Sequence, residues 1–508
     1  MNIAFQIEQM ALEQPDALAL CFEEARWTYR QLNEQANRFA SVLETLGVVP
    51  GDRVALMLPN IPAFVWSYLG ILKCGAIAVS INNTLTTREV RIILNDCRPV
   101  AAIATPEAQS HFPRQSPYLL NLFLTPEDGG LGVLDALMAG ADPELTARDM
   151  AGDAPAAIVY SSGTTGTPKG VTLSHNNVLT NMAAKRRYCG MRPDDRLLLC
   201  VPLYHCFGQN AILNSGLAAG ATIILLRRFE PESALAAIAR HAITMVFGVP
   251  TMYRILLERA EPGQLASVRY YFSGAAILPP SLARAWHARF GRVINEGYGL
   301  TETSPFAAYN HESGYKFGSV GTPIERVRIK IVDVESGLAL GPGQVGEIAI
   351  SGPNVMLGYW NMPEETAQVI RDGWFHTGDL GTLDADGYLY LVDRLKDMIN
   401  VAGMKVYPAE VEQVLYQHPV VAEAAVYGVA DDLSGERVEA SIVAREPLPL
   451  RELMKLCRAY LAPFKIPTAI HMVDSIPKNA TGKPLKRVLR EAAAAEQANA
   501  AQAGGRRA

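Results

Sequence analysis

The chain has 508 residues, of which 49% are hydrophobic and 19% charged. This composition is typical of a globular protein rather than a disordered one, and the length allows roughly three domains. The formal net charge of −5 gives no positive field that would attract nucleic acid.

No apolar run reaches the ~18 residues that a membrane span requires. The amino terminus, Met1–Ala17, carries acidic residues where a secretory signal has basic ones. We therefore expect a cytoplasmic protein without a transmembrane segment. The 7 cysteines are scattered and never form a CxxC pair, which favours reduced packing residues over a disulfide framework or a zinc site.

Strand-like and helix-like segments alternate along the first three-quarters of the chain. Thr28 and Gln31 have the spacing of a capping box, which predicts a helix running toward Leu46. The predicted strands are Arg53–Leu58, Ala76–Ser80, Thr222–Leu226 and Met245–Gly248, and the predicted helices are Ala63–Cys74, Thr87–Asp96, Pro231–His241 and Pro250–Glu258. This alternation favours parallel sheets covered by helices.

The pattern changes after Arg326. Val327–Val332 and Gly346–Ile350 alternate around a Gly-Pro-Gly turn at Gly341–Gly343, which predicts a small antiparallel or β-barrel-like subdomain. Beyond Asp393 a shorter α+β pattern begins. Its predicted elements are a helix at Ala409–His418, an extended segment at Val420–Val429 and a helix at Leu450–Leu461.

We place the domain boundary at Asp393–Lys396, which divides residues 1–393 from residues 394–508. The tail from Glu491 to Ala508 is rich in Ala, Gln and Gly, so we expect a frayed helix and disorder there.

A glycine-rich run, SSGTTGTPKG at Ser161–Gly170, follows the apolar stretch Ala156–Tyr160. Glycines let the backbone approach an anion and point N–H groups at it, hydroxyls add donors, and a lysine adds positive charge. The run therefore predicts a polyphosphate-binding loop. It is not a Walker loop, because no Ser or Thr follows Lys169 directly. A flexible linker is the alternative, but strand-like runs bracket this segment.

Further motifs follow in order: YGLTET at Tyr298–Thr303, HTGD at His376–Asp379, DRLKD at Asp393–Asp397 and NATGK at Asn479–Lys483. Together with the glycine-rich run, they resemble the signatures of the adenylate-forming enzymes, the superfamily of acyl-CoA synthetases, firefly luciferase and peptide-synthetase adenylation domains. The resemblance covers almost the whole chain. It implies an α/β fold with a large N-terminal domain of parallel βα subdomains, a small β-barrel-like subdomain and a mobile α+β C-terminal domain.

The resemblance also implies ATP, Mg²⁺ and coenzyme A as ligands and assigns residues to them. Tyr298 is expected to pack on adenine, Thr301 to bond the α-phosphate, and Glu302 to ligate Mg²⁺ together with Thr165. The other nucleotide-binding residues expected in the N-terminal domain are Ser161, Ser162, Gly163, Thr164, Gly166, Lys169, Gly274, Ala275, Ala276, Gly297 and Gly299.

The resemblance places Asp379, near the end of the N-terminal domain, and Arg394, at the start of the C-terminal domain, at the ribose. It makes Lys396 the hinge of a domain rotation. Lys483 is expected to bridge the carboxylate and the α-phosphate during adenylation. The loop at Gly403 is expected to line the site of thioester formation.

For the acid substrate, the resemblance assigns His205 to orienting the carboxylate, with Ser273–Ala276 and Ser304–Ala308 lining the acyl pocket. These two segments have small or apolar side chains without charge. We therefore expect an apolar monocarboxylic acid, with a medium- or long-chain fatty acid favoured and an aryl or cinnamate-like acid as the alternative.

Several alternatives stay open. The acceptor could be coenzyme A or the phosphopantetheine of an acyl carrier protein, and the ATP motifs do not separate them. A non-catalytic sensor would lack Lys169, Glu302 or Lys483, which are all present, and amino-acid adenylation lacks an acidic residue beside His205. The basic clusters Lys185–Arg187 and Arg227–Arg228 are solvated faces or contacts for the phosphates of coenzyme A or an acidic carrier protein.

Overall fold

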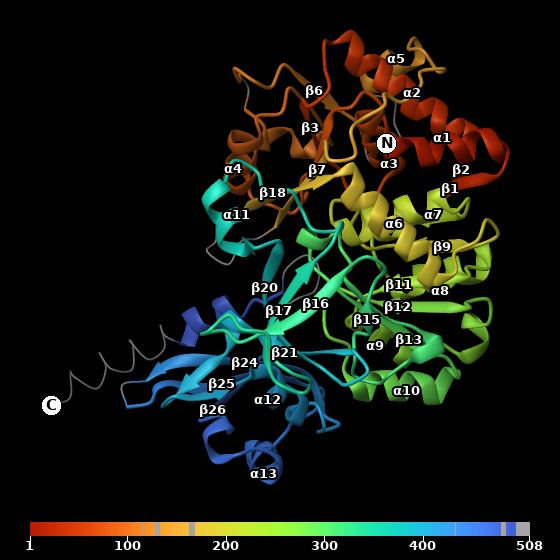
Figure 1. Ribbon diagram of the computed structural model, residues 1–508. Helices are drawn as coiled ribbons and strands as arrows, with labels where there is room; N and C mark the ends of the chain where they lie inside the picture. Colours follow the sequence, from red (N-terminus) through yellow and green to blue (C-terminus); the bar gives the residue numbers. More distant parts are fainter. Residues whose placement is uncertain (114, 127–132, 162–167, 432, 479–483, 494–508) are drawn as a thin grey trace. The chain divides into compact units, whose positions relative to one another are not determined.

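The computed structural model describes residues 1–493 with the exception of residues 114, 127–132, 162–167, 432 and 479–483. The chain forms two compact units (Figure 1). The larger unit comprises Met1–Leu278, Leu282–Ile329 and Ile350–His376, and the smaller one comprises Pro279–Ser281, Lys330–Ala349 and the described residues from Thr377 onward.

The first sheet of the larger unit has seven strands in the order β18-β8-β7-β4-β3-β5-β6. Its strands are β3 (Arg53–Met57), β4 (Ile77–Ser80), β5 (Ala101–Ala104), β6 (Asn121–Leu124), β7 (Pro155–Ser161), β8 (Lys169–Ser174) and β18 (Gly358–Tyr359). The strands from β7 to β6 pair in parallel, whereas β8 pairs antiparallel with both β7 and β18. The predicted parallel sheet is therefore confirmed, with an antiparallel edge beside the glycine-rich run.

The second sheet has nine strands in the order β15-β14-β13-β12-β11-β9-β10-β1-β2. Its strands are β1 (Leu18–Phe22), β2 (Ala25–Thr28), β9 (Arg196–Leu199), β10 (Thr222–Leu225), β11 (Met245–Gly248), β12 (Tyr270–Ser273), β13 (Ile294–Tyr298), β14 (Ala308–Asn310) and β15 (Thr322–Pro323). The strands from β13 to β1 pair in parallel, and antiparallel strands close both edges. Parallel strands gather their carboxyl ends at one edge, where ligands of open α/β sheets bind.

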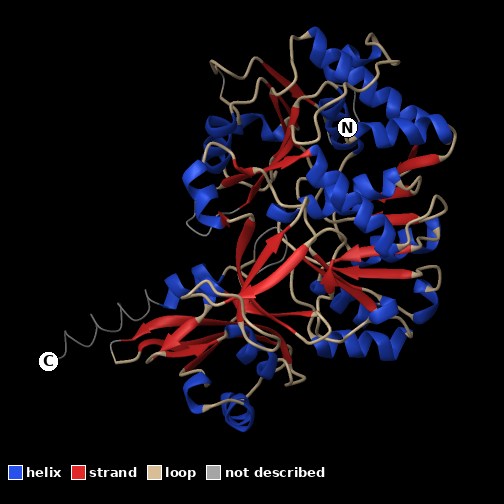
Figure 2. Cartoon of the chain, viewed as in Figure 1, coloured by secondary structure: helices blue, strands red, loops and turns tan. Residues whose placement is uncertain are grey.

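Helices accompany both sheets of the larger unit (Figure 2). They are α1 (Ala4–Glu13), α2 (Tyr29–Thr45), α3 (Pro62–Lys73), α4 (Thr87–Cys97), α5 (Val133–Ala139), α6 (His175–Cys189), α7 (Ser215–Ala218), α8 (Pro231–His241), α9 (Pro250–Arg259), α10 (Pro280–Phe290) and α11 (Pro363–Val369), with a π-helix at Phe207–Asn214. The predicted capping box is present, because Thr28 and Gln31 bond reciprocally at the start of α2.

Strands predominate in the rest of the chain. One sheet has the order β16-β17-β20-β19 with β21 beside β20, and another has the order β23-β22-β25-β24 with β26 beside β25. The elements are β16 (Arg328–Val332), β17 (Gly346–Ser351), β19 (Ile370–Arg371), β20 (Trp374–Leu383), β21 (Leu389–Arg394), β22 (Ile399–Val401), β23 (Met404–Val406), β24 (Val421–Asp431), β25 (Gly435–Ala444), β26 (Ala469–Met472), α12 (Pro408–Leu415) and α13 (Leu450–Tyr460). The predicted α/β architecture is confirmed.

All 7 cysteines are free and buried, as the sequence predicts. No helix in the described part of the chain combines the length and apolar character that crossing a membrane requires.

Candidate active site

The glycine-rich run connects β7 to β8 as a hairpin. Ser161 pairs with Lys169, so the two ends of the run are fixed opposite each other. The predictions for Ser162, Gly163, Thr164, Thr165 and Gly166 concern residues outside those described.

The stem of this hairpin is anchored on its neighbours. The hydroxyl of Tyr160 donates a hydrogen bond of 2.5 Å to Asp96 on α4. A Cβ atom at Gly170 would lie 2.9 to 3.2 Å from the side chains of Ile158, Tyr160 and Trp360, so glycine allows these three side chains to close over the stem. The base of the loop is therefore rigidly placed.

Tyr359 connects Lys169 with Glu302. The Lys169 ammonium lies 4.9 Å from the centroid of the Tyr359 ring, a cation–π distance. The Tyr359 hydroxyl donates a hydrogen bond of 3.0 Å to Oε1 of Glu302. Burial, and then the Glu302 carboxylate, raise the pKa of Tyr359 far above its usual value, so its hydroxyl stays protonated and donates. Sequence reasoning missed Tyr359, which lies more than fifty residues after the YGLTET motif.

The YGLTET motif forms the end of β13 and a 3-10 turn at Thr301–Thr303. Two buried amides hold this turn, because Asn181 on α6 and Asn354 each donate to the carbonyl oxygens of both Thr303 and Phe306 at 2.8 to 3.2 Å. Neither asparagine was predicted from the sequence. Their bonds fix the backbone that carries Thr301 and Glu302.

Glycine is required within the motif. A Cβ atom at Gly299 would lie 1.9 Å from the carbonyl oxygen of Pro305, which no relaxation of a side chain could relieve. Tyr298, the predicted adenine contact, is buried at the end of β13.

His205 lies on the segment that follows β9, and its side chain is partly buried. The N–H of Phe207 donates to its Nδ1 at 3.2 Å, which places the proton of the neutral ring on Nε2. Burial lowers the pKa of His205 to about 4, so the ring is neutral at pH 7. The Cys206 thiol donates to the hydroxyl of Thr301 at 3.5 Å, so the structure brings the His205 segment beside Thr301.

Three phenyl rings meet at the predicted acyl pocket. The ring centroids of Phe207, Phe272 and Phe306 are 5.1 to 6.0 Å apart. A Cβ atom at Gly274 would lie 3.3 to 3.6 Å from the rings of Phe272 and Phe207, and one at Gly297 would lie 2.8 to 3.1 Å from those of Phe272 and Phe306. The two predicted glycines therefore let the rings pack against the backbone.

The other two residues predicted beside Gly274 differ from it in exposure. Ala275 and Ala276 follow β12 and are exposed, and Ala275 adopts a left-handed backbone conformation with φ of 66°. Both side chains are therefore accessible to a ligand at the carboxyl end of the strand.

In the smaller unit, the two predicted ribose residues are cross-strand neighbours. Asp379 on β20 pairs with Arg394 on β21, and Nε of Arg394 lies 3.2 Å from Oδ1 of Asp379. Asp379 is 9% exposed, so the guanidinium partner compensates a largely buried carboxylate.

The remaining predicted residues of this unit follow β21. Lys396 is exposed in a 3-10 turn at Leu395–Asp397. Gly403 and Ala402 form the two-residue turn between β22 and β23, and both have a positive φ. The prediction for Lys483 concerns a residue outside those described.

The interpretation of the cluster Lys185–Arg187 as a solvated or phosphate-binding face is wrong for Lys185. Its side chain is buried at 2% exposure, because it lies on the inner side of α6. Three of the other basic residues pair with nearby carboxylates: Arg187 with Glu325, Arg227 with Glu23 and Arg228 with Glu230.

Comparisons with known proteins agree with this architecture. A family model described as AMP-binding enzyme matches residues 7–360, and one described as AMP-binding enzyme C-terminal domain matches residues 410–483. The chain is 37% identical to a feruloyl-CoA synthase of Amycolatopsis sp, covering 94% of this chain and 96% of the relative. It is 36% identical to a long-chain-fatty-acid–CoA ligase of Bacillus subtilis, covering 94% of this chain and 92% of that relative. The crystal structure of ATP-bound MatB from Rhodopseudomonas palustris superposes with a TM-score of 0.92 at 33% identity, covering 97% of this chain and 99% of that one.

Proposed function

The chain belongs to the AMP-binding enzyme family, and we propose that within it this protein activates an aromatic, cinnamate-like carboxylic acid. It is an AMP-forming acid–thiol ligase that acts through an acyl-adenylate and uses ATP and coenzyme A. The identity of the acid and the roles of individual residues are the subject of the proposal.

A carboxylate is a poor acyl donor because its negative charge repels nucleophiles and oxide is a poor leaving group. Attack of the carboxylate oxygen on the α-phosphorus of ATP forms acyl-AMP and releases pyrophosphate. The thiolate of coenzyme A then attacks the acyl carbon and releases AMP. Since the first step joins two anions, positive charge and oriented donors must surround the phosphate.

We assign these donors to the larger unit. Lys169 and the glycine-rich run hold the phosphates, and Thr301 bonds the α-phosphate. His205 is neutral at pH 7, with its proton on Nε2, so it can donate a hydrogen bond to the carboxylate. The contact between Cys206 and Thr301 supports this arrangement, because it brings the acid-binding and phosphate-binding residues together.

Glu302 is the residue proposed to hold Mg²⁺. A carboxylate together with phosphate oxygens is a donor set that suits this hard cation. The described residues contain no group of three or more His, Cys, Asp or Glu side chains that could hold a metal by themselves, so the nucleotide would supply the other ligands. The bound ion would neutralise phosphate charge, and Tyr359 orients the carboxylate.

The aromatic acid is favoured by the rings of Phe207, Phe272 and Phe306. Aromatic rings prefer edge-to-face or offset contacts with one another, and these three already make such contacts. A planar substrate ring could join this cluster, with its carboxylate at His205. The feruloyl-CoA synthase relative acts on an acid of this kind, whereas the Bacillus relative acts on long-chain fatty acids, the alternative.

In the smaller unit we assign Asp379 and Arg394 to the ribose, Lys396 to the hinge and Lys483 to the adenylation step. The pairing of Asp379 with Arg394 supports the first assignment, because it holds one carboxylate where two ribose hydroxyls could donate to it.

The test is release of pyrophosphate from ATP with matched acids: cinnamate, benzoate, octanoate and palmitate, each with coenzyme A or with a phosphopantetheinylated acyl carrier protein. We expect the largest kcat/KM with cinnamate and coenzyme A. A preference for palmitate would overturn the aromatic assignment, and transfer to the carrier protein alone would identify a carrier-loading ligase.

A further inference from the structure

Lys185 is a buried cation on α6. Val178, Met182, Lys185 and Cys189 lie at positions i, i+4, i+7 and i+11, which form one side of a helix, and all four are buried. Lys185 therefore occupies a core position in which an apolar side chain is usual.

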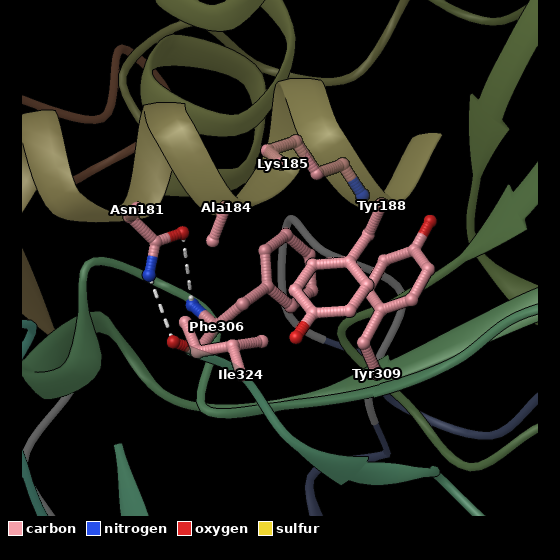
Figure 3. Close-up of a pocket in the computed structure, with 7 residues that line it drawn as sticks. All are labelled: Asn181, Ala184, Lys185, Tyr188, Phe306, Tyr309 and Ile324. Atoms are coloured by element: carbon pink, nitrogen blue, oxygen red, sulfur yellow. Dashed lines mark hydrogen bonds between the residues drawn. The ribbon is translucent and has the colours of Figure 1, made fainter. Parts of the chain in front are cut away.

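Aromatic rings surround the Lys185 ammonium. Its Nζ lies 3.1 Å from the ring centroid of Phe272, 4.4 Å from that of Phe306, 5.0 Å from that of Tyr309 and 5.1 Å from that of Phe247. Figure 3 shows the Lys185 side chain extending from α6 toward the rings of Phe306 and Tyr309, two of the four rings that surround it. Such contacts stabilise a cation, but they accept no conventional hydrogen bond from it.

The N–H donors of this ammonium have no strong acceptor among the described residues, and its polar neighbour is the Cys189 sulfur, a weak acceptor. Burial lowers the pKa of Lys185 to about 8, and the nearby Cys189 thiol opposes this shift. Since a buried donor without a partner is costly, an acceptor delivered by a ligand would be bound favourably.

The four rings around Nζ, those of Phe247, Phe272, Phe306 and Tyr309, form an aromatic cage that adjoins the predicted acyl pocket. The rings of Phe272 and Phe306 each contact the Lys185 ammonium, and each also packs against the backbone at Gly297. Both rings also contact Phe207, which lies two residues after His205. The rings therefore connect the His205 end of the pocket with Lys185.

A small cavity lies beside the cage. It has a volume of about 10 Å³ and is lined by Asn181, Ala184, Lys185, Tyr188, Phe306, Tyr309 and Ile324. This is about the space that one water molecule needs, and a bridging water can relay a hydrogen bond.

We propose that Lys185 determines specificity by binding an acceptor oxygen at the distal end of the acid, directly or through one water molecule. The carboxylate lies at His205, the body of the acid packs against the phenyl rings, and a hydroxyl or second carboxylate at the far end accepts from the ammonium. This inference rests on the proposed function, since it uses the same acyl site. It adds a charge that the segments Ser273–Ala276 and Ser304–Ala308 lack.

The test compares three acids that differ only at the distal position: cinnamate, 4-hydroxycinnamate and 4-carboxycinnamate. The wild-type enzyme is expected to prefer one of the two oxygen-bearing acids over cinnamate. In Lys185→Met, which keeps the length of the side chain without its charge, that preference is expected to fall roughly 10- to 100-fold. Arg187→Met is the matched control, because it removes an exposed cation from the same helix, and it should preserve the preference.

Lys185→Gln distinguishes a hydroxyl acceptor from a carboxylate acceptor. It also replaces Lys185→Met in the test if that variant does not fold. Glutamine keeps an N–H donor without charge, so it should retain selection for the hydroxyl but lose selection for the carboxylate. An unchanged preference in both variants would overturn the inference and leave Lys185 as a packing residue, while adenylation itself persists. If no acid at all gives AMP, the proposed function fails together with this inference.

Discussion

Tyr359 donates a hydrogen bond of 3.0 Å from its hydroxyl to the carboxylate of Glu302. The same ring faces Lys169 from β18, which pairs with the strand that Lys169 begins. One side chain thus contacts both the lysine proposed to bind phosphate and the carboxylate proposed for Mg²⁺. We therefore expect Tyr359 to act on the reaction through these two residues, as a positioning residue.

Tyr359→Phe removes this hydrogen bond but keeps the ring beneath Lys169. We expect kcat/KM for adenylation to fall about 10- to 100-fold, since a hydrogen bond to a charged group contributes about 1.5–3 kcal/mol. The Mg²⁺ concentration for half-maximal rate should rise. Pyrophosphate release at graded Mg²⁺ measures both. Tyr118→Phe, which removes a hydroxyl bonded to Asn95, is the control. Equal Mg²⁺ dependence in the variant and the wild type would contradict the positioning role.

Asn354→Ala should loosen the turn that carries Thr301 and Glu302. It removes two buried hydrogen bonds to the carbonyls of Thr303 and Phe306, so we expect a loss of about 1–3 kcal/mol in unfolding free energy and a lower kcat. Asn37→Ala removes a comparable bond from a buried asparagine to the carbonyl of Pro143. The control should lose stability but keep kcat, and a matching loss of kcat in both variants would mean that destabilisation alone explains the effect.

Asp379→Asn tests the proposed ribose contact in the smaller unit. The substitution keeps the shape of the side chain but weakens its acceptance of two hydroxyl protons and its pairing with Arg394. We expect KM for ATP to rise about 10-fold, by roughly 1.4 kcal/mol of lost binding. Glu491→Gln, which removes an exposed ion pair with Arg487, should leave KM unchanged. A normal KM in the Asp379 variant would place the ribose elsewhere.

Lys483→Ala and Lys396→Pro should affect opposite half-reactions. Without the Lys483 ammonium, we expect acyl-adenylate formation to be strongly suppressed, while thioester formation from supplied acyl-adenylate continues. Proline at Lys396 should restrict the backbone rotation proposed for the second step, so it should impair thioester formation more. Single-turnover assays of each half-reaction distinguish the two, and equal losses in both would contradict this division of roles.

The buried imidazole of His175 should make the free energy of unfolding depend on pH. Its ring is fully buried at the start of α6, where Nδ1 accepts from the N–H of Ile3 at 3.2 Å. Burial lowers its pKa to about 4, below the value of about 6.5 in the unfolded chain. Between these values the unfolded state binds the extra proton, so stability falls as the pH is lowered from 7 toward 4.

His175→Gln should remove this part of the acid sensitivity. We expect the variant to lose about 2 kcal/mol less unfolding free energy than the wild type between pH 7 and pH 5. Denaturant unfolding at both pH values measures the difference, and His287→Gln, at an exposed site, is the control. An identical pH dependence in all three proteins would refute the role of His175.

The sequence predicted much of the fold because its patterns are local. The predicted helix Pro231–His241 and strand Met245–Gly248 coincide with α8 and β11, since proline, periodicity and β-branched residues mark their bounds. The pairing of Asp379 with Arg394 was not specified by any motif, although the two motifs that contain them follow each other closely. It follows from the hairpin that β20 and β21 form.

The residues that sequence reasoning missed contact the site from positions far away in the sequence. Tyr359, Asn181 and Asn354 bond to the YGLTET turn from segments that contain no recognisable functional motif. Lys185 was misinterpreted because it begins a basic run, and only the helical register from Val178 to Cys189 places it inside. Applying that register to the run could have found it.

The products of ATP turnover test the central claim most directly. The purified protein would be incubated with ATP, Mg²⁺, coenzyme A and the panel of acids, and the nucleotide and thioester products would be quantified. We predict that AMP, pyrophosphate and acyl-CoA form in equal amounts and only when an acid is present. Release of ADP and phosphate, or no acid-dependent turnover with any member of the panel, would contradict the account.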